Sequence, residues 1–180
     1  MMHELLNLLT GGDRRSIGRV QEVVAEVLRD PSLFGEVFYG MLNDDPLISM
    51  RAADAIEKIT AQRPDYLSPY KDVLITQVAA KSQQEVRWHV AQLIPCLQLD
   101  QHERVILFDI LITYLNDSSA IVKTFSLQAL ADLALQDDSL LPETIRLLKV
   151  HTETGSPAMK SRGRKLLQKL TGVSSSQKPE

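Results

Sequence analysis

The sequence has little of several things that whole classes of protein require. Its 180 residues include one cysteine, Cys96, which excludes an internal disulfide and any zinc site built from cysteines. Aromatic residues make up only 5% of the chain, which argues against an all-β protein because strands favour aromatic side chains. No apolar run approaches the roughly 18 residues of a membrane span, and the N-terminus lacks the segments of a secretory signal. We therefore expect a cytoplasmic protein without a membrane segment.

Sequence motifs typical of catalytic, metal-binding or phosphate-binding sites are also scarce. No two of the four histidines lie four residues apart, so the chain has no zinc-binding helix of the HExxH type. Two His-Glu pairs, His3-Glu4 and His102-Glu103, are 99 residues apart and do not form a local set of ligands. Glycine-rich phosphate loops are absent as well. The sequence thus predicts that the protein is not an enzyme and has no catalytic residues, no metal site and no cofactor.

The net charge of −3 conceals an asymmetry along the chain. Residues 156–180 carry a net charge of +5, so the preceding residues carry −8. A possible basic patch consists of Arg162, Arg164, Lys165 and Lys169. These side chains either face an acidic partner or phosphates, or belong to a solvated helix whose cations lie near the negative end of its dipole.

What the sequence does contain is a repeated apolar pattern. Counting from Val86 as position 0, apolar residues fall at positions 0, 4, 7, 8 and 11, which is one face of a helix. The same pattern starts at Ile48, Val122 and Met159, so the copies are 38, 36 and 37 residues apart. Eighteen of these twenty positions are apolar, where about nine would be expected by chance. A weaker copy covers residues 20–27.

A second apolar helix is predicted between consecutive copies. These helices cover residues 31–42, 68–80, 102–115 and 140–150, with a partial one at 2–9. Helix starts are expected where an N-cap residue precedes proline, at residues 30–31, 45–46, 68–69 and 156–157. Ser82 and Glu85 have the spacing of a capping box. Pro95 should kink or shorten its helix.

The repeating unit is therefore a helical hairpin of about 36 residues. One hairpin cannot bury both of its apolar faces, but hairpins stacked side by side share a continuous core. The sequence predicts one all-α domain over residues 1–171 and a flexible C-terminal tail at 172–180. Its five units are expected at about 1–29, 30–62, 67–98, 102–135 and 139–171.

Over residues 13–171 the chain resembles the HEAT-repeat family. The resemblance rests on "DDPLISMRAADAIEKI", "QQEVRWHVAQLIPCL", "NDSSAIVKTFSLQALADLA" and "GSPAMKSRGRKLLQKL". Val86-Arg87 matches the Val-Arg pair of such repeats, whereas the preceding unit has Ser49 in place of the arginine. The resemblance implies a right-handed α-solenoid whose second helices line a concave surface.

A series of basic residues recurs near the start of the second helices, namely Arg51, Arg87, Lys123 and Lys160. The series either forms an exposed ridge that binds phosphates or carboxylates, or is structural. The resemblance favours the structural role, because the matching arginine of HEAT-like repeats bonds an Asp in the turn of an adjacent unit. Asp13, Asp45 and Asp117 occupy such turns.

Residues opposite the apolar face, at positions 2, 5, 6 and 9, are expected to face solvent. The candidate partner-binding residues among them are Met50, Asp54, Trp88, Gln92, Thr124, Leu127 and Gln128. Two interpretations of Trp88 remain open. It is either an exposed anchor for a partner, or it packs against a neighbouring helix as part of the core.

The sequence thus predicts a non-enzymatic scaffold or adaptor that binds another protein through the concave surface, with a helix or peptide as the bound element. The alternative is a nucleic-acid-binding protein similar to the HEAT-like alkylpurine DNA glycosylases. Similarity to these glycosylases would imply a strongly basic concave face and aromatic residues at the lesion. A net charge of −3 and a single tryptophan argue against it.

Overall fold

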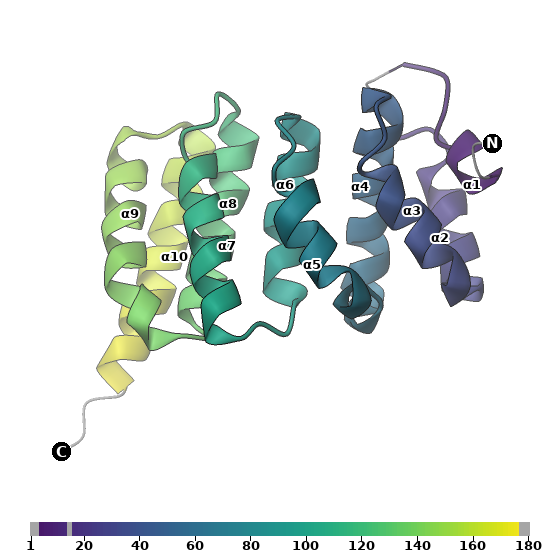
Figure 1. Cartoon of the computed structure of the whole chain (residues 1–180). Coiled ribbons are helices and arrows are strands. Elements are labelled where there is room, and N and C mark those ends of the chain that lie inside the picture. The colour runs from purple at the N-terminus through teal and green to yellow at the C-terminus, as the bar shows by residue number, and fades with distance from the viewer. Residues whose placement is uncertain (1–3, 14–15, 177–180) are drawn as a thin grey trace. The chain divides into compact units, whose positions relative to one another are not determined.

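Helices make up all the regular secondary structure of this protein in its computed structural model, which describes residues 4–13 and 16–176 (Figure 1). Within these ranges there is no β-strand. The chain divides into two compact units, Met1–Gln98 and Leu99–Glu180. That all five hairpins form one continuous domain remains a prediction.

The first unit holds three helical hairpins. Their first helices are short: α1 (Glu4–Asn7), α3 (Phe34–Gly40) and α5 (Lys71–Val73). Their second helices, which carry the repeated pattern, are α2 (Val20–Arg29), α4 (Pro46–Gln62) and α6 (Gln84–Leu93). The middle helix α4 packs against α3 of its own hairpin and against both α2 and α6. Consecutive second helices therefore lie side by side, as stacked hairpins require.

The second unit holds two hairpins, α7 (Gln101–Tyr114) with α8 (Ala120–Ala134), and α9 (Leu141–Thr154) with α10 (Pro157–Ser176). Helix α10 packs against both α9 and α8. The predicted flexible tail at 172–180 is wrong in part, because α10 continues through Ser176. Residues 177–180 lie outside the described part of the chain.

Burial confirms the repeated apolar pattern. Every pattern position in the four strong copies is buried except Leu167, which is half-buried, and the four valines of the weaker copy are buried too. Removing each of the Val, Leu, Ile and Met side chains among them from water stabilises the fold by about 1.5–3 kcal/mol. The shared core of the hairpins is therefore built from the residues that the spacing identified.

Most of the predicted helix starts are confirmed. The Asp45 side chain accepts a hydrogen bond from the Leu47 amide at 2.8 Å, with Pro46 at the first position of α4. Asp30 caps the 3-10 turn at Pro31–Leu33 in the same way. At the start of α10, the Met159 amide donates to the Ser156 hydroxyl at 3.4 Å.

Two helix starts were predicted wrongly. The N-cap residue of α6 is Gln83, and no side chain makes a capping hydrogen bond there. Ser82 and Glu85 therefore do not form the expected capping box. The box occurs instead at the start of α7, where Asp100 and Glu103 cap each other's backbone amides. The predicted start at residues 68–69 lies inside a 3-10 segment, Pro64–Tyr70.

Proline and local geometry also shape the third hairpin. Helix α6 ends at Leu93 and passes into a 3-10 turn, Ile94–Cys96, because Pro95 cannot continue the α-helical hydrogen bonds. This confirms the predicted shortening. The segment predicted as a helix at 68–80 is irregular, since α5 leads directly into a π-helical stretch at Leu74–Val78.

Arg51 holds the loop that precedes α2. It is only 1% exposed, and its guanidinium donates hydrogen bonds to backbone carbonyls of this loop, including those of Leu9 (2.9 Å), Gly11 (2.7 Å) and Asp13 (3.1 Å). Gly18 has a φ of +56°, and a Cβ there would lie 2.9 Å from the guanidinium carbon. Of the two interpretations of the basic series, the structural role therefore holds for Arg51 and the exposed ridge does not, although its bonds go to backbone carbonyls and not to an Asp carboxylate.

Candidate partner-binding site

The candidate site of the first unit lies on two neighbouring second helices. On α4, Met50, Asp54 and Glu57 follow each other at intervals of four and three residues, which places them along one face. Trp88 and Gln92 do the same on α6. Since α4 and α6 pack together, the structure brings the candidate residues of these two helices onto adjoining faces.

A pocket of about 190 Å³ opens at this place. Its walls are formed by Ser16, Ile17, Met50, Arg51, Asp54, Trp88 and His89. Ile17 is 49% exposed, and Met50 and Trp88 are half-buried. Trp88 thus belongs neither to the core nor to the open surface but forms part of an apolar wall, with Asp54 and His89 as the polar side of the pocket.

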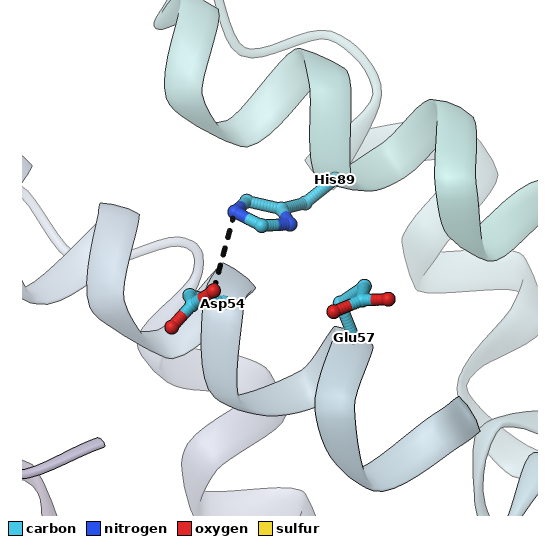
Figure 2. Close-up of side chains that lie close together, drawn as sticks. All are labelled: Asp54, Glu57 and His89. Atoms are coloured by element: carbon cyan, nitrogen blue, oxygen red, sulfur yellow. Dashed lines mark ion pairs between the residues drawn. The ribbon is translucent and has the colours of Figure 1, made fainter. Parts of the chain in front are cut away.

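Three polar side chains meet beside the pocket (Figure 2). Asp54, Glu57 and His89 each offer one possible ligand atom, and these atoms lie within 4.8 Å of one another. Nε2 of His89 lies 3.9 Å from Oδ1 of Asp54. Lys58 pairs with the same carboxylate from the next turn of α4. The Gln92 amide donates to Oε1 of Glu57 at 3.4 Å.

Burial controls the protonation of this cluster. It lowers the pKa of His89 to about 4, an effect that the Lys58 charge reinforces and that Asp54 and the Gln92 side chain oppose. The imidazole is therefore neutral at pH 7, and its contact with Asp54 is not an ion pair under those conditions. Burial also raises the pKa of Glu57, with Lys58 opposing and Asp54 adding to the shift.

The candidate residues of the second unit are less exposed than predicted. Leu127 is fully buried and Thr124 is buried as well, so the prediction that they face solvent is wrong. Helix α8 contacts α7, α9 and α10, which leaves only a narrow strip of it open. Ala53 and Ala91 occupy the same position 5 as Leu127 and are equally buried. Gln128 is half-buried and accepts a hydrogen bond from Arg162 at 3.0 Å.

The second unit has its own pocket between α8 and α10. It measures about 230 Å³ and is lined by Ala120, Ile121, Thr124, Phe125, Ala158 and Arg162. Like Ile17 in the first unit, Ile121 is 49% exposed. The sequence reasoning missed Ile17, Ile121 and Phe125 because it considered only positions opposite the apolar face. These three residues could have been found in the sequence as apolar residues that lie just before or beside the apolar face.

The four residues of the predicted basic patch do not share one face of α10. At about 100° per residue, Arg164 points roughly opposite to Arg162, whereas Lys165 and Lys169 lie within about 60° of Arg162. The Arg162 guanidinium lies 5.9 Å from the Phe125 ring centre, and Nζ of Lys169 is 3.8 Å from Oδ1 of Asp132. Two of the four cations are thus directed at α8, and only Arg164 and Lys165 remain as purely surface charges.

The cluster of Asp54, Glu57 and His89 was not recognised in the sequence. Asp54 and Glu57 were expected to face solvent, and His89 was considered only for ligands on its own helix. Their meeting depends on the register between adjacent hairpins, which spacing within one helix does not reveal. The signal in the sequence is that all three residues lie on consecutive second helices, at positions 6, 9 and 3 of the pattern.

Among the described helices, none has both the length and the apolarity to cross a membrane. Comparison with protein families matches the HEAT repeat domain over residues 11–170, and such repeats are generally non-enzymatic mediators of protein interactions. No curated protein and no solved structure matches the chain. The match covers most of the sequence and agrees with the helical hairpins, which confirms the predicted fold class. The HEAT repeat domain suggests a role of the interaction-scaffold kind. The chain therefore belongs to the HEAT-repeat family.

Proposed function

We propose that this protein is a non-enzymatic scaffold that binds a helix or peptide of another protein along the open strip of its second helices. The observation that carries the proposal is the pocket between α4 and α6, whose apolar wall includes Ile17, Met50 and Trp88. When a partner covers apolar side chains that are otherwise in contact with water, their burial contributes favourable free energy to binding. Tryptophan is enriched among residues that dominate binding energy.

The second unit supports the same function. Its pocket also lies between consecutive second helices, α8 and α10, and it has Ile121 and Phe125 in its wall. A partner helix would place one apolar side chain in such a pocket and its polar residues against the rim. Asp54 and Gln92 beside the first pocket, and Gln128 and Arg162 beside the second, are suited to that rim.

The test is a pull-down from a cell extract with the purified chain as bait, followed by mass spectrometry. Trp88→Ala and Met50→Asp should each lower recovery of a specific partner at least tenfold, because a buried anchor is worth about 2 kcal/mol or more. Val105→Ala is the matched control, since it removes an exposed apolar side chain from a first helix, α7. Circular dichroism melts must show that all three variants fold.

Equal recovery by the wild type and a folded Trp88→Ala variant would contradict the proposal. The nucleic-acid alternative has weaker support, because the basic side chains of α10 are divided between two faces. A gel shift with duplex DNA at low salt separates the two functions, since only nucleic-acid binding predicts a salt-sensitive complex.

A further inference from the structure

We propose that Asp54, Glu57 and His89 form a binding site for a divalent transition-metal cation, with Zn²⁺ as the best-suited ion. The three side chains come from two adjacent helices, and their possible ligand atoms lie within 4.8 Å of one another. This departs from the sequence prediction that the chain binds no metal. It is independent of the proposed partner, because it concerns the isolated chain.

Two buried atoms of the cluster make it more than a group of acidic residues. His89 is only 7% exposed, and neither its Nδ1 nor Oδ2 of Asp54 has a hydrogen-bond partner among the described residues. A buried polar atom without a partner destabilises the folded chain, because it has lost its hydrogen bonds to water. In Figure 2 the ring nitrogen of His89 that does not face Asp54 is turned toward the side of Glu57. A cation on that side of the imidazole would give Nδ1 of His89 a partner that the described part of the chain does not provide.

The donor set indicates which kind of ion fits. One imidazole nitrogen and two carboxylates are ligands that Zn²⁺ accepts, whereas Mg²⁺ and Ca²⁺ prefer sites made of oxygen alone. Ligand atoms around a tetrahedral Zn²⁺ are about 3.4 Å apart, given metal–ligand distances near 2.1 Å. The atoms must therefore approach by about 1.4 Å at most, and rotation of the half-buried Glu57 side chain provides most of that movement.

Lys58 is the main obstacle to the cation. Its ammonium group pairs with Asp54 and would repel a metal bound there. The ammonium group lies on a flexible side chain that is 31% exposed, so it is free to turn toward solvent when the metal enters. Lys58 thus provides an internal test, because removal of its charge should strengthen binding of a cation at this cluster.

Trp88 allows the site to be observed directly. It is the single tryptophan of the chain, and its ring centre lies 5.5 Å from that of His89. Titration of metal-free protein with Co²⁺ should quench its fluorescence in a saturable way, and Zn²⁺ should reverse the quenching by competition. Calorimetry should show one Zn²⁺ per chain.

The variants decide whether the cluster is the site. Glu57→Gln, which preserves the shape of a half-buried side chain, should weaken Zn²⁺ binding at least tenfold. His89→Asn should do the same, and Lys58→Gln should tighten binding several-fold. Glu85→Gln and His102→Ala are the controls, since they remove a half-buried carboxylate and an exposed imidazole outside the cluster and should leave the affinity unchanged. Failure of the wild type to bind Zn²⁺ saturably, or equal binding by a folded Glu57→Gln variant, would overturn the proposal.

Discussion

His89 shows how packing changes the chemistry of one residue. Its side chain is enclosed between α4 and α6, and the loss of water around it lowers the pKa to about 4. The carboxylate of Asp54 favours the protonated form and offsets part of this shift, while Lys58 acts in the opposite direction. The uncharged imidazole that results is also the form able to coordinate a metal ion.

The same burial makes stability depend on pH. The unfolded chain, with His89 near its ordinary pKa of 6.5, binds more protons than the folded chain between pH 6.5 and about 4. His89 should therefore contribute stability that is present above pH 6.5 and is lost as the pH falls to about 4, by up to about 3 kcal/mol. Asp54, Glu57 and Lys58 of α4 are the ionisable groups that face it.

Urea unfolding at several pH values in the presence of EDTA measures this contribution. The free energy of unfolding of the wild type should fall more steeply between pH 6.5 and 4 than that of His89→Gln, which has no ionisable group at this position. His102→Gln, at an exposed site, should behave like the wild type. Parallel curves for wild type and His89→Gln would show that burial does not lower the pKa of this histidine.

Helix α10 illustrates how one small residue fits two elements together. Gly163 occupies a pattern position where an apolar side chain is usual, and α9 approaches it closely. A Cβ at Gly163 would lie 2.0 Å from Oγ1 and 3.2 Å from Cβ of Thr152. Glycine is therefore required at this crossing because there is no space for a side chain.

Two substitutions on α10 separate packing from helix propensity. Gly163→Leu should lower the free energy of unfolding by about 2–3 kcal/mol, because the added side chain must displace Thr152 and part of α9. Gly172→Leu should be neutral or raise it by up to about 1 kcal/mol, since no described atom beyond the nearby backbone of its own helix lies within 4 Å of its Cβ position, and leucine favours helix. Thermal or urea unfolding compares them, and equal effects would contradict the tight α9–α10 crossing.

At the scale of elements, the sequence predicted the second helices better than the first. The apolar spacing from Ile48, Val86, Val122 and Met159 located α4, α6, α8 and α10, because long periodic faces must be buried in any stack of hairpins. The segment at 68–80 was predicted less well. Its apolar composition indicated a helix, but the 3-10 and π geometry around α5 depends on tertiary packing rather than local preference.

The candidate site was only partly predictable, because part of it depends on how neighbouring helices pack against each other. Met50 and Trp88 were identified because their positions oppose the apolar face of their own helix. Leu127 was misassigned because position 5 of the pattern is buried against neighbouring helices, as it is at Ala53 and Ala91 as well. The contact of His89 with Asp54 and Glu57 required the register between two hairpins, which no single-helix pattern contains.

At the scale of the whole molecule, the match to the HEAT repeat domain spans both compact units. Repeats of this kind bury their apolar faces against neighbouring repeats, so the surface left for a partner is a property of the stack and not of one hairpin. In each unit a pocket lies between consecutive second helices, at α4–α6 and at α8–α10. The proposed scaffold function assigns the partner to these helices in both units.

Hydrogen–deuterium exchange of the chain, free and bound to the partner recovered in the pull-down, locates the contact most directly. We expect slower amide exchange in α4 and α6 of the complex, and in α8 and α10 if the partner spans both units, with α3 and α7 unchanged. Protection confined to the first helices α3, α7 and α9, with none in α4 or α6, would contradict binding through the second helices.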